Sequence, residues 1–126
     1  MEYINTQKAP KAVGPYSQAI LVNNILYASG QIAIDPATQT MLDGDVTAQT
    51  EQIIKNISAV LEAAGLDFKN VVKTTCFLAD MSDFAVFNSV YEKYFISKPA
   101  RSCVAAKELP KNALVEIEVI AIKETL

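Results

Sequence analysis

The sequence Pro99-Ala100-Arg101-Ser102-Cys103-Val104, followed by Leu109-Pro110 and Leu114-Val115-Glu116-Ile117, carries two charged side chains within stretches typical of β-strands. The guanidinium of Arg101 offers a planar fork that binds a carboxylate through two parallel hydrogen bonds. The carboxylate of Glu116, held among aliphatic residues, can act as an acid or a base. Because the chain contains no histidine, its chemistry has to rely on such a pair or on nearby hydroxyl, thiol and backbone groups.

Strand alternation places Arg101 and Cys103 on one face of their strand, and Glu116 and Glu118 on one face of the next. A hairpin centred near Leu109-Pro110 would pair Cys103 with Glu116 and Arg101 with Glu118. Arg101 would then lie within diagonal reach of Glu116. A register slip of one residue would turn one set away, and another strand or another subunit can also intervene.

Outward from this stretch, the sequence predicts an α+β fold with the order β-β-α-β-α-β-β. The predicted strands cover residues 16–22, 25–34, 71–79, 101–106 and 113–122, with a turn at Asn23-Asn24. One helix is predicted from the cap Asp45 to about Ala64, ending at Gly65. A second helix begins near Ser82, ends before Pro99 and buries a stripe of Phe84, Phe87, Tyr91, Tyr94 and Phe95. Right-handed crossovers place both helices on the same face of a single mixed sheet.

The last predicted strand has no polar face. Its two sides both carry apolar residues: Leu114, Ile120 and Ile122 alternate with Val115, Ile117, Val119 and Ala121. Since both helices cover the same face of the sheet, the other face needs a partner surface. The sequence therefore predicts a homo-oligomer.

Composition limits the class of protein. The 126 residues, 51% hydrophobic and 20% charged, predict one folded domain spanning residues 1–126. A net charge of −3 argues against general affinity for nucleic acid. The N-terminus lacks the pattern of a signal peptide, and no apolar run is long enough to span a bilayer, so we expect a cytoplasmic protein without membrane contact. Cys76 and Cys103 are far apart, and without histidine a structural zinc site is excluded.

Taken singly, the polar residues have ordinary structural explanations. A lone Arg101 is most often an exposed or ion-paired strand residue, and a lone Glu116 is most often a solvated carboxylate at a strand edge. Cys103 is more simply a small buried residue than a nucleophile, because no histidine is present to activate it. Ser29-Gly30 is compatible with a β-bulge or with close approach of the backbone to a ligand.

In combination, the motifs closely resemble those of the RidA/YjgF (Rid) family over nearly the entire chain. The matching segments, in order, are Gly14-Pro15-Tyr16-Ser17-Gln18, Ala28-Ser29-Gly30-Gln31-Ile32, Val72-Lys73-Thr74-Thr75, Pro99-Ala100-Arg101-Ser102-Cys103-Val104, Leu109-Pro110-Lys111 and Val115-Glu116-Ile117-Glu118. The resemblance implies a chorismate-mutase-like fold and a homotrimer with clefts between its subunits. One departure is the short loop between Phe95 and Pro99, where Lys98 replaces an aromatic residue found in many relatives.

The resemblance also implies an activity: hydrolysis of reactive enamines and imines, such as 2-aminoacrylate and 2-iminobutyrate, to 2-keto acids and ammonia, without cofactor or metal. Arg101 matches the family's carboxylate-binding arginine and Glu116 its water-orienting glutamate. The positions that match the lining of the family's pocket are Tyr16, Ser29, Gly30, Asn88 and Cys103.

Two other functions are compatible with the same scaffold. The first is a non-catalytic regulatory protein that binds a keto acid through Arg101 and signals to a protein partner. The second is an RNA-directed nuclease or translation inhibitor, a label that some relatives carry. The acidic balance, the lack of histidine and the lack of a basic–aromatic stripe disfavour the second.

Overall fold

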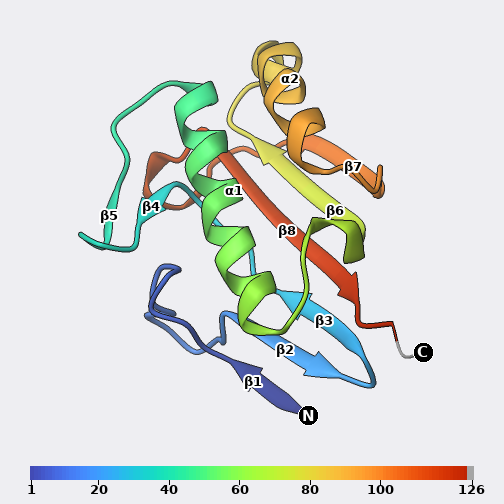
Figure 1. Ribbon diagram of the computed structural model, residues 1–126. Helices are drawn as coiled ribbons and strands as arrows, with labels where there is room; N and C mark the ends of the chain where they lie inside the picture. Colours follow the sequence, from blue (N-terminus) through green and yellow to red (C-terminus); the bar gives the residue numbers. More distant parts are fainter. Residues whose placement is uncertain (125–126) are drawn as a thin grey trace.

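The computed structural model describes residues 1–124 as one mixed six-stranded sheet, with both long helices on the same face (Figure 1). The strand order is β1-β2-β3-β8-β6-β7. The strands are β1 (Glu2–Ile4), β2 (Ala19–Val22), β3 (Ile25–Ala28), β6 (Val71–Leu78), β7 (Ala100–Ala105) and β8 (Val115–Ile122), and the helices are α1 (Val46–Ala63) and α2 (Phe84–Tyr94). A separate small hairpin joins β4 (Ile34–Asp35) to β5 (Thr40–Met41). The predicted α+β fold is confirmed.

The helix α1 begins and ends where the sequence predicts. The Asp45 carboxylate accepts a hydrogen bond from the backbone N–H of Ala48 at 2.9 Å, which satisfies one of the free donors of the first turn. After the helix, Gly65 takes a positive φ of 77°, which glycine adopts without steric cost. Within residues 1–124, no helix is long and apolar enough to cross a membrane.

The buried side of α2 differs in part from the predicted stripe, of which Phe84 is only partly buried. Phe87, Tyr91 and Phe95 are buried, as expected, but Tyr94 is 39% exposed and Val90 is buried instead. Val90 lies one turn after Phe87, so it falls on the core side of the helix. Tyr94 also has helical spacing from Phe87, so the spacing alone did not distinguish it from Val90.

The N-terminal strands are shorter than predicted. Asn23 and Asn24 form the expected turn, with positive φ values of 49° and 63°. The strand β3 stops at Ala28, and the chain pairs with β8 again only at Gln31, opposite Ile117. The strand β1 was not predicted from the sequence; it adds to β2 at the edge of the sheet.

The predicted hairpin between the last two strands is wrong. The strand β6 lies between them, parallel to β7 and antiparallel to β8. Arg101 therefore pairs with Thr74, which pairs in turn with Val119. The intervening strand, one of the alternatives left open by the sequence, separates Arg101 from Glu116.

The face of the sheet opposite the helices is not covered by any other element of the described chain (Figure 1). Val115, Ile117 and Val119 are buried beneath the helices, whereas Glu116 and Glu118 alternate to the open face. Tyr27 and Val104, 47% and 50% exposed, also lie on that face by strand register. This arrangement supports the prediction of an oligomer, which remains a prediction.

Candidate active site

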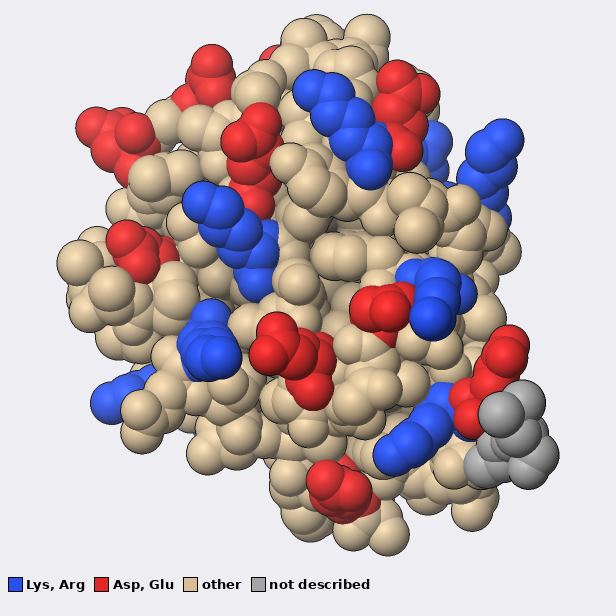
Figure 2. Space-filling model, in the orientation of Figure 1, with Lys and Arg blue, Asp and Glu red and all other residues tan. Residues whose placement is uncertain are grey.

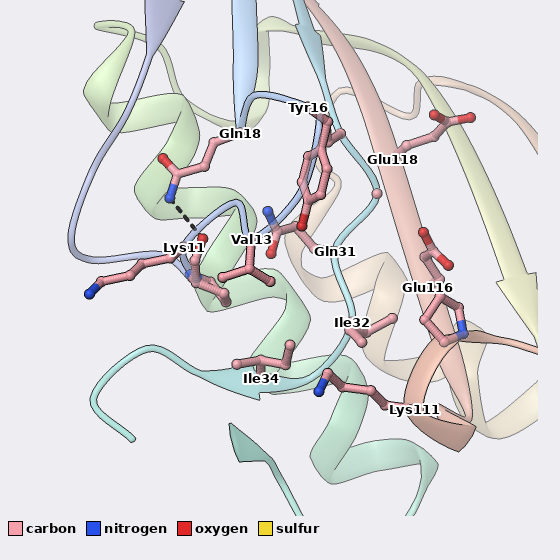
Figure 3. A pocket seen from close by; sticks show the side chains of 14 residues that line it. Lys11, Val13, Tyr16, Gln18, Gln31, Ile32, Ile34, Lys111, Glu116 and Glu118 are labelled. Atoms are coloured by element: carbon pink, nitrogen blue, oxygen red, sulfur yellow. Dashed lines mark hydrogen bonds between the residues drawn. The ribbon is translucent and has the colours of Figure 1, made fainter. Parts of the chain in front are cut away.

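A cavity of about 540 Å³ lies beside β8, and Glu116 forms part of its wall (Figure 3). It forms where β3 ends, beside the loop that precedes β2. The polar side chains around it are those of Lys11, Tyr16, Gln18, Ser29, Gln31, Lys111, Glu116 and Glu118. Glu116 and Glu118 come from the same strand, two residues apart, and follow one another along it in the view.

The break after β3 places backbone directly against Glu116. A Cβ atom added to Gly30 would lie 3.0 Å from the carboxyl carbon of Glu116 and 3.2 Å from its Cγ. Only a residue without a side chain allows this approach. The neighbouring Ser29 hydroxyl donates to the carbonyl oxygen of Ser17 at 2.6 Å, so its lone pairs remain available to accept a hydrogen bond.

The loop that carries Tyr16 is held by the buried amide of Gln18. The Gln18 Nε2 donates to the carbonyl oxygens of Pro10 at 2.8 Å and Thr6 at 3.0 Å, and its Oε1 accepts from the Thr6 N–H at 2.7 Å. The bond to Pro10 is the dashed line of Figure 3. No function was predicted for Gln18 from the sequence; its signals were a polar side chain in a predicted strand and its place in the segment from Gly14 to Gln18.

Two amide side chains of α1 form hydrogen bonds to the backbone of the segments on the other sides of the first cavity. The Nδ2 of the fully buried Asn56 donates to the carbonyl oxygens of Ile32 at 3.3 Å and Ile34 at 2.9 Å. The Oε1 of Gln49 accepts from the N–H of Leu114 at 2.9 Å, just after the turn that contains Lys111. These bonds fix the cavity lining to the helix layer.

Arg101 lies on the other face of the sheet, beneath α2. Its Nη1 donates to the Oδ1 of Asn88 at 2.6 Å. Its guanidinium carbon lies 4.7 Å from the centroid of the Tyr91 ring and 5.4 Å from that of Phe84. A second cavity, of about 480 Å³, opens here, and Lys98 is also part of its lining.

The predicted site residues therefore fall into two groups. Tyr16, Ser29, Gly30 and Glu116 surround the first cavity. Asn88 and Arg101 line the second, and Cys103 lies on the same face of β7 as Arg101. The expected contact between Arg101 and Glu116 within one chain does not occur, because the sheet stands between their side chains.

The family model described as Endoribonuclease L-PSP matches residues 6–123. The chain belongs to the RidA/YjgF (Rid) family. It is 48% identical to the human 2-iminobutanoate/2-iminopropanoate deaminase, over 98% of this chain and 90% of that protein.

Solved structures of other Rid-family proteins have the same fold. A protein of unknown function of the conserved Rid family from Yersinia pestis is 50% identical, with a TM-score of 0.94 over 97% of this chain and 98% of that one. The TdcF protein of E. coli, solved with bound serine, is 38% identical, with a TM-score of 0.93 over 98% of this chain and 100% of that one.

Burial sets the ionisation of the carboxyl and thiol groups in this Rid-family chain. Half-burial raises the pKa of Glu116, and the nearby charge of Glu118 raises it further. Burial also raises the pKa of Cys103, against a smaller lowering by Arg101, and raises that of Cys76 to about 12. Both cysteines are therefore thiols at neutral pH, which argues against a thiolate nucleophile.

The contribution of Glu118 to the Glu116 pKa can be tested by substitution. In Glu118→Gln, loss of the like charge should lower the pKa of Glu116. If Glu116 acts as a base in a reaction that this chain catalyses, the acidic limb of the plot of kcat/KM against pH should move to lower pH. Lys123→Gln, another charge change on the chain that follows β8, serves as the control. An acidic limb that stays in place in Glu118→Gln would contradict this coupling.

Proposed function

We propose that this Rid-family chain hydrolyses small 2-imino acids, such as 2-iminobutyrate and the imine of 2-aminoacrylate, to 2-keto acids and ammonia. The observation that carries the proposal is a pair of charged groups, each beside its own cavity. One is the Arg101 guanidinium, which is hydrogen-bonded to Asn88, and the other is the half-buried carboxyl group of Glu116, whose pKa is raised. The name of the human relative supports this activity. The serine in TdcF supports a ligand that carries a carboxylate and an amine.

Arg101 is proposed to bind the substrate carboxylate. A guanidinium has five N–H donors, and Asn88 accepts a hydrogen bond from Nη1. The other nitrogens can form the two parallel bonds that fit a carboxylate. Two such hydrogen bonds fix the position of the adjacent C=N carbon and lower the entropic part of the activation barrier for hydrolysis.

A complete site is proposed to require two subunits of a homotrimer. Arg101 and Glu116 project from opposite faces of one sheet, so a single small substrate cannot reach both in one chain. The open face carries exposed apolar side chains such as Tyr27 and Val104, which favour association with a second copy. We infer that Arg101 of one copy and Glu116 of the next share a cleft.

Glu116 is proposed to activate the water. The protonated imine carbon is already electrophilic, so water attack needs positioning and a proton acceptor. Glu116 takes a proton from the water as the C–O bond forms, and the product is a carbinolamine. Glu116 then returns the proton to the amine nitrogen. As the C–N bond breaks, Glu116 takes the proton of the carbinolamine hydroxyl, so that the keto acid forms and ammonia leaves; this proton then passes to ammonia, which restores the carboxylate. The raised pKa suits this role, because a base works best with a pKa near the working pH. Ser29 and Tyr16 are proposed to accept or donate hydrogen bonds to the carbinolamine.

The direct test is an assay that generates 2-iminobutyrate in place and measures release of 2-oxobutyrate and ammonia. The Arg101→Lys variant should raise KM at least about tenfold, because an ammonium loses the bidentate geometry of a charge-assisted hydrogen bond. The Lys93→Gln variant, on the exposed side of α2, is a control for loss of a nearby positive charge. A wild-type kcat/KM in Arg101→Ala would refute the proposal. Binding of 2-oxobutyrate without turnover of any imine would favour the regulatory alternative.

The charge distribution does not favour the nuclease alternative. On the helix-bearing face, basic and acidic side chains are interspersed and form no continuous basic track (Figure 2). The first cavity is lined by two carboxylates, Glu116 and Glu118, as well as by Lys11 and Lys111, so its charged side chains give it no basic excess.

A further inference from the structure

One side of α2 is directed at Arg101 at three positions along the helix. Phe84, Asn88 and Tyr91 are spaced i, i+4 and i+7, which places them in a row on one helix face. The middle residue accepts a hydrogen bond from the guanidinium, and the outer two place aromatic rings within cation–π distance of it. Arg101 thus contacts the Phe84 ring, the Asn88 amide and the Tyr91 ring.

The Tyr91 ring is itself held on several sides. Its hydroxyl shares a hydrogen bond of 2.7 Å with Thr74, the residue paired with Arg101 in the sheet. Its ring stacks on Phe95 at 4.2 Å between centroids with an interplanar angle of 20°. Phe95 in turn forms a T-shaped contact with Phe68, with the ring centroids 5.2 Å apart. The row of rings Phe68, Phe95 and Tyr91 therefore leads to the Arg101 guanidinium, and Tyr91 and Phe95 within it are buried in the core.

We propose that Tyr91, assisted by Phe84, is a positioning residue that fixes the Arg101 guanidinium for carboxylate binding. This inference rests on the proposed function of Arg101. A free arginine side chain samples many rotamers, and ordering it when the ligand binds weakens the binding. The two rings and Asn88 restrict the guanidinium before the ligand arrives, so Arg101 is already ordered at the wall of the second cavity.

The Tyr91→Leu variant tests the ring, with 2-oxobutyrate binding measured by calorimetry. Loss of one cation–π contact and of the restriction that it imposes should weaken binding about 2- to 30-fold. Val90→Ala is the control, since it removes buried apolar atoms from the same helix, whereas the cation–π contacts of Arg101 in the described chain are with Phe84 and Tyr91. Tyr91→Phe keeps the ring and removes the bond to Thr74, so it should have a smaller effect than Tyr91→Leu.

A double-mutant cycle with Arg101→Gln separates this role from a general structural one. If Tyr91 acts through the guanidinium, Tyr91→Leu should weaken binding only when Arg101 is present. An equal loss in both backgrounds, or no loss in Tyr91→Leu, would overturn the inference. If Arg101→Gln binds 2-oxobutyrate as tightly as the wild type does, both the proposed function and this inference fail. If Arg101→Gln weakens the binding but Tyr91→Leu does not, only this inference fails and the proposed role of Arg101 is kept.

An NMR measurement gives a readout that does not depend on activity. The Nε–H resonance of Arg101, located by its loss in Arg101→Gln, should be displaced by the ring currents of Tyr91 and Phe84. It should move toward the position of a free arginine in Tyr91→Leu and stay nearly unchanged in Val90→Ala. A resonance already at the free-arginine position in wild type would overturn the inference.

Discussion

Replacing Glu116 with glutamine is expected to lower kcat for imine hydrolysis by about 10²–10⁴-fold, the usual contribution of a positioned acid–base group. Glutamine keeps the size and hydrogen bonding of the side chain but cannot take a proton from water. Binding of 2-oxobutyrate should change little, because Arg101 is proposed to hold the carboxylate. Stopped assays of keto acid release and calorimetry measure the two quantities separately.

The neighbouring Glu118→Gln is the matched control, since it makes the same change two residues along the strand. It should retain most of the wild-type kcat at neutral pH. A Glu116→Gln variant with kcat close to wild type would show that this carboxylate does not handle the proton.

The Glu116→Gln variant should also alter the pH dependence of stability. The folded state raises the pKa of Glu116, so it binds this proton more tightly than the unfolded state does. The free energy of unfolding should therefore fall as the pH rises from the usual glutamate range through the raised pKa. This part of the pH dependence should be absent in Glu116→Gln, as measured by urea unfolding.

A Gly30→Ala substitution is expected to lower kcat by about 10²-fold, the size of effect that a displacement of about 1 Å can have at a reacting group. The added methyl group would meet the carboxyl carbon and Cγ of Glu116 at 3.0 Å and 3.2 Å. The side chain would have to turn away from its position beside the cavity. Steady-state kinetics on 2-iminobutyrate measure the loss.

The control for Gly30→Ala is Gly44→Ala. Its added methyl group would lie 2.9 Å from the Cβ of Ala48, at the start of α1 and outside the lining of both cavities near the predicted site residues. It should lower the thermal midpoint and leave kcat unchanged. If Gly30→Ala loses stability to the same extent but keeps its kcat, the fit between Gly30 and Glu116 does not matter for catalysis.

Local features of the fold could be predicted because short-range chemistry determines them. The Asp45 cap, the Gly65 stop and the Asn23-Asn24 turn each depend on a few neighbouring residues. The position of β6 between β7 and β8 depends on pairing between residues far apart in sequence, and nothing in the sequence of the two later strands reveals it. The hairpin prediction failed for this reason.

The site was predictable as a set of residues but not as an arrangement. Resemblance to the Rid family supplied the identities, including Arg101 and Glu116. Which face each one occupies follows from the strand register and needed the structure. Tyr91 had been assigned to the core from its helical spacing; its contact with Arg101 became visible only when β7 was placed beneath α2.

Subunit complementation tests the central claim, that Arg101 and Glu116 of different copies form one site. Arg101→Ala and Glu116→Gln subunits with different tags would be co-expressed, and mixed trimers isolated through both tags. If each site joins two copies, one of the three sites in every mixed trimer is intact, so about one third of the wild-type kcat per trimer should return. Mixed trimers no more active than the two parent variants would contradict the account.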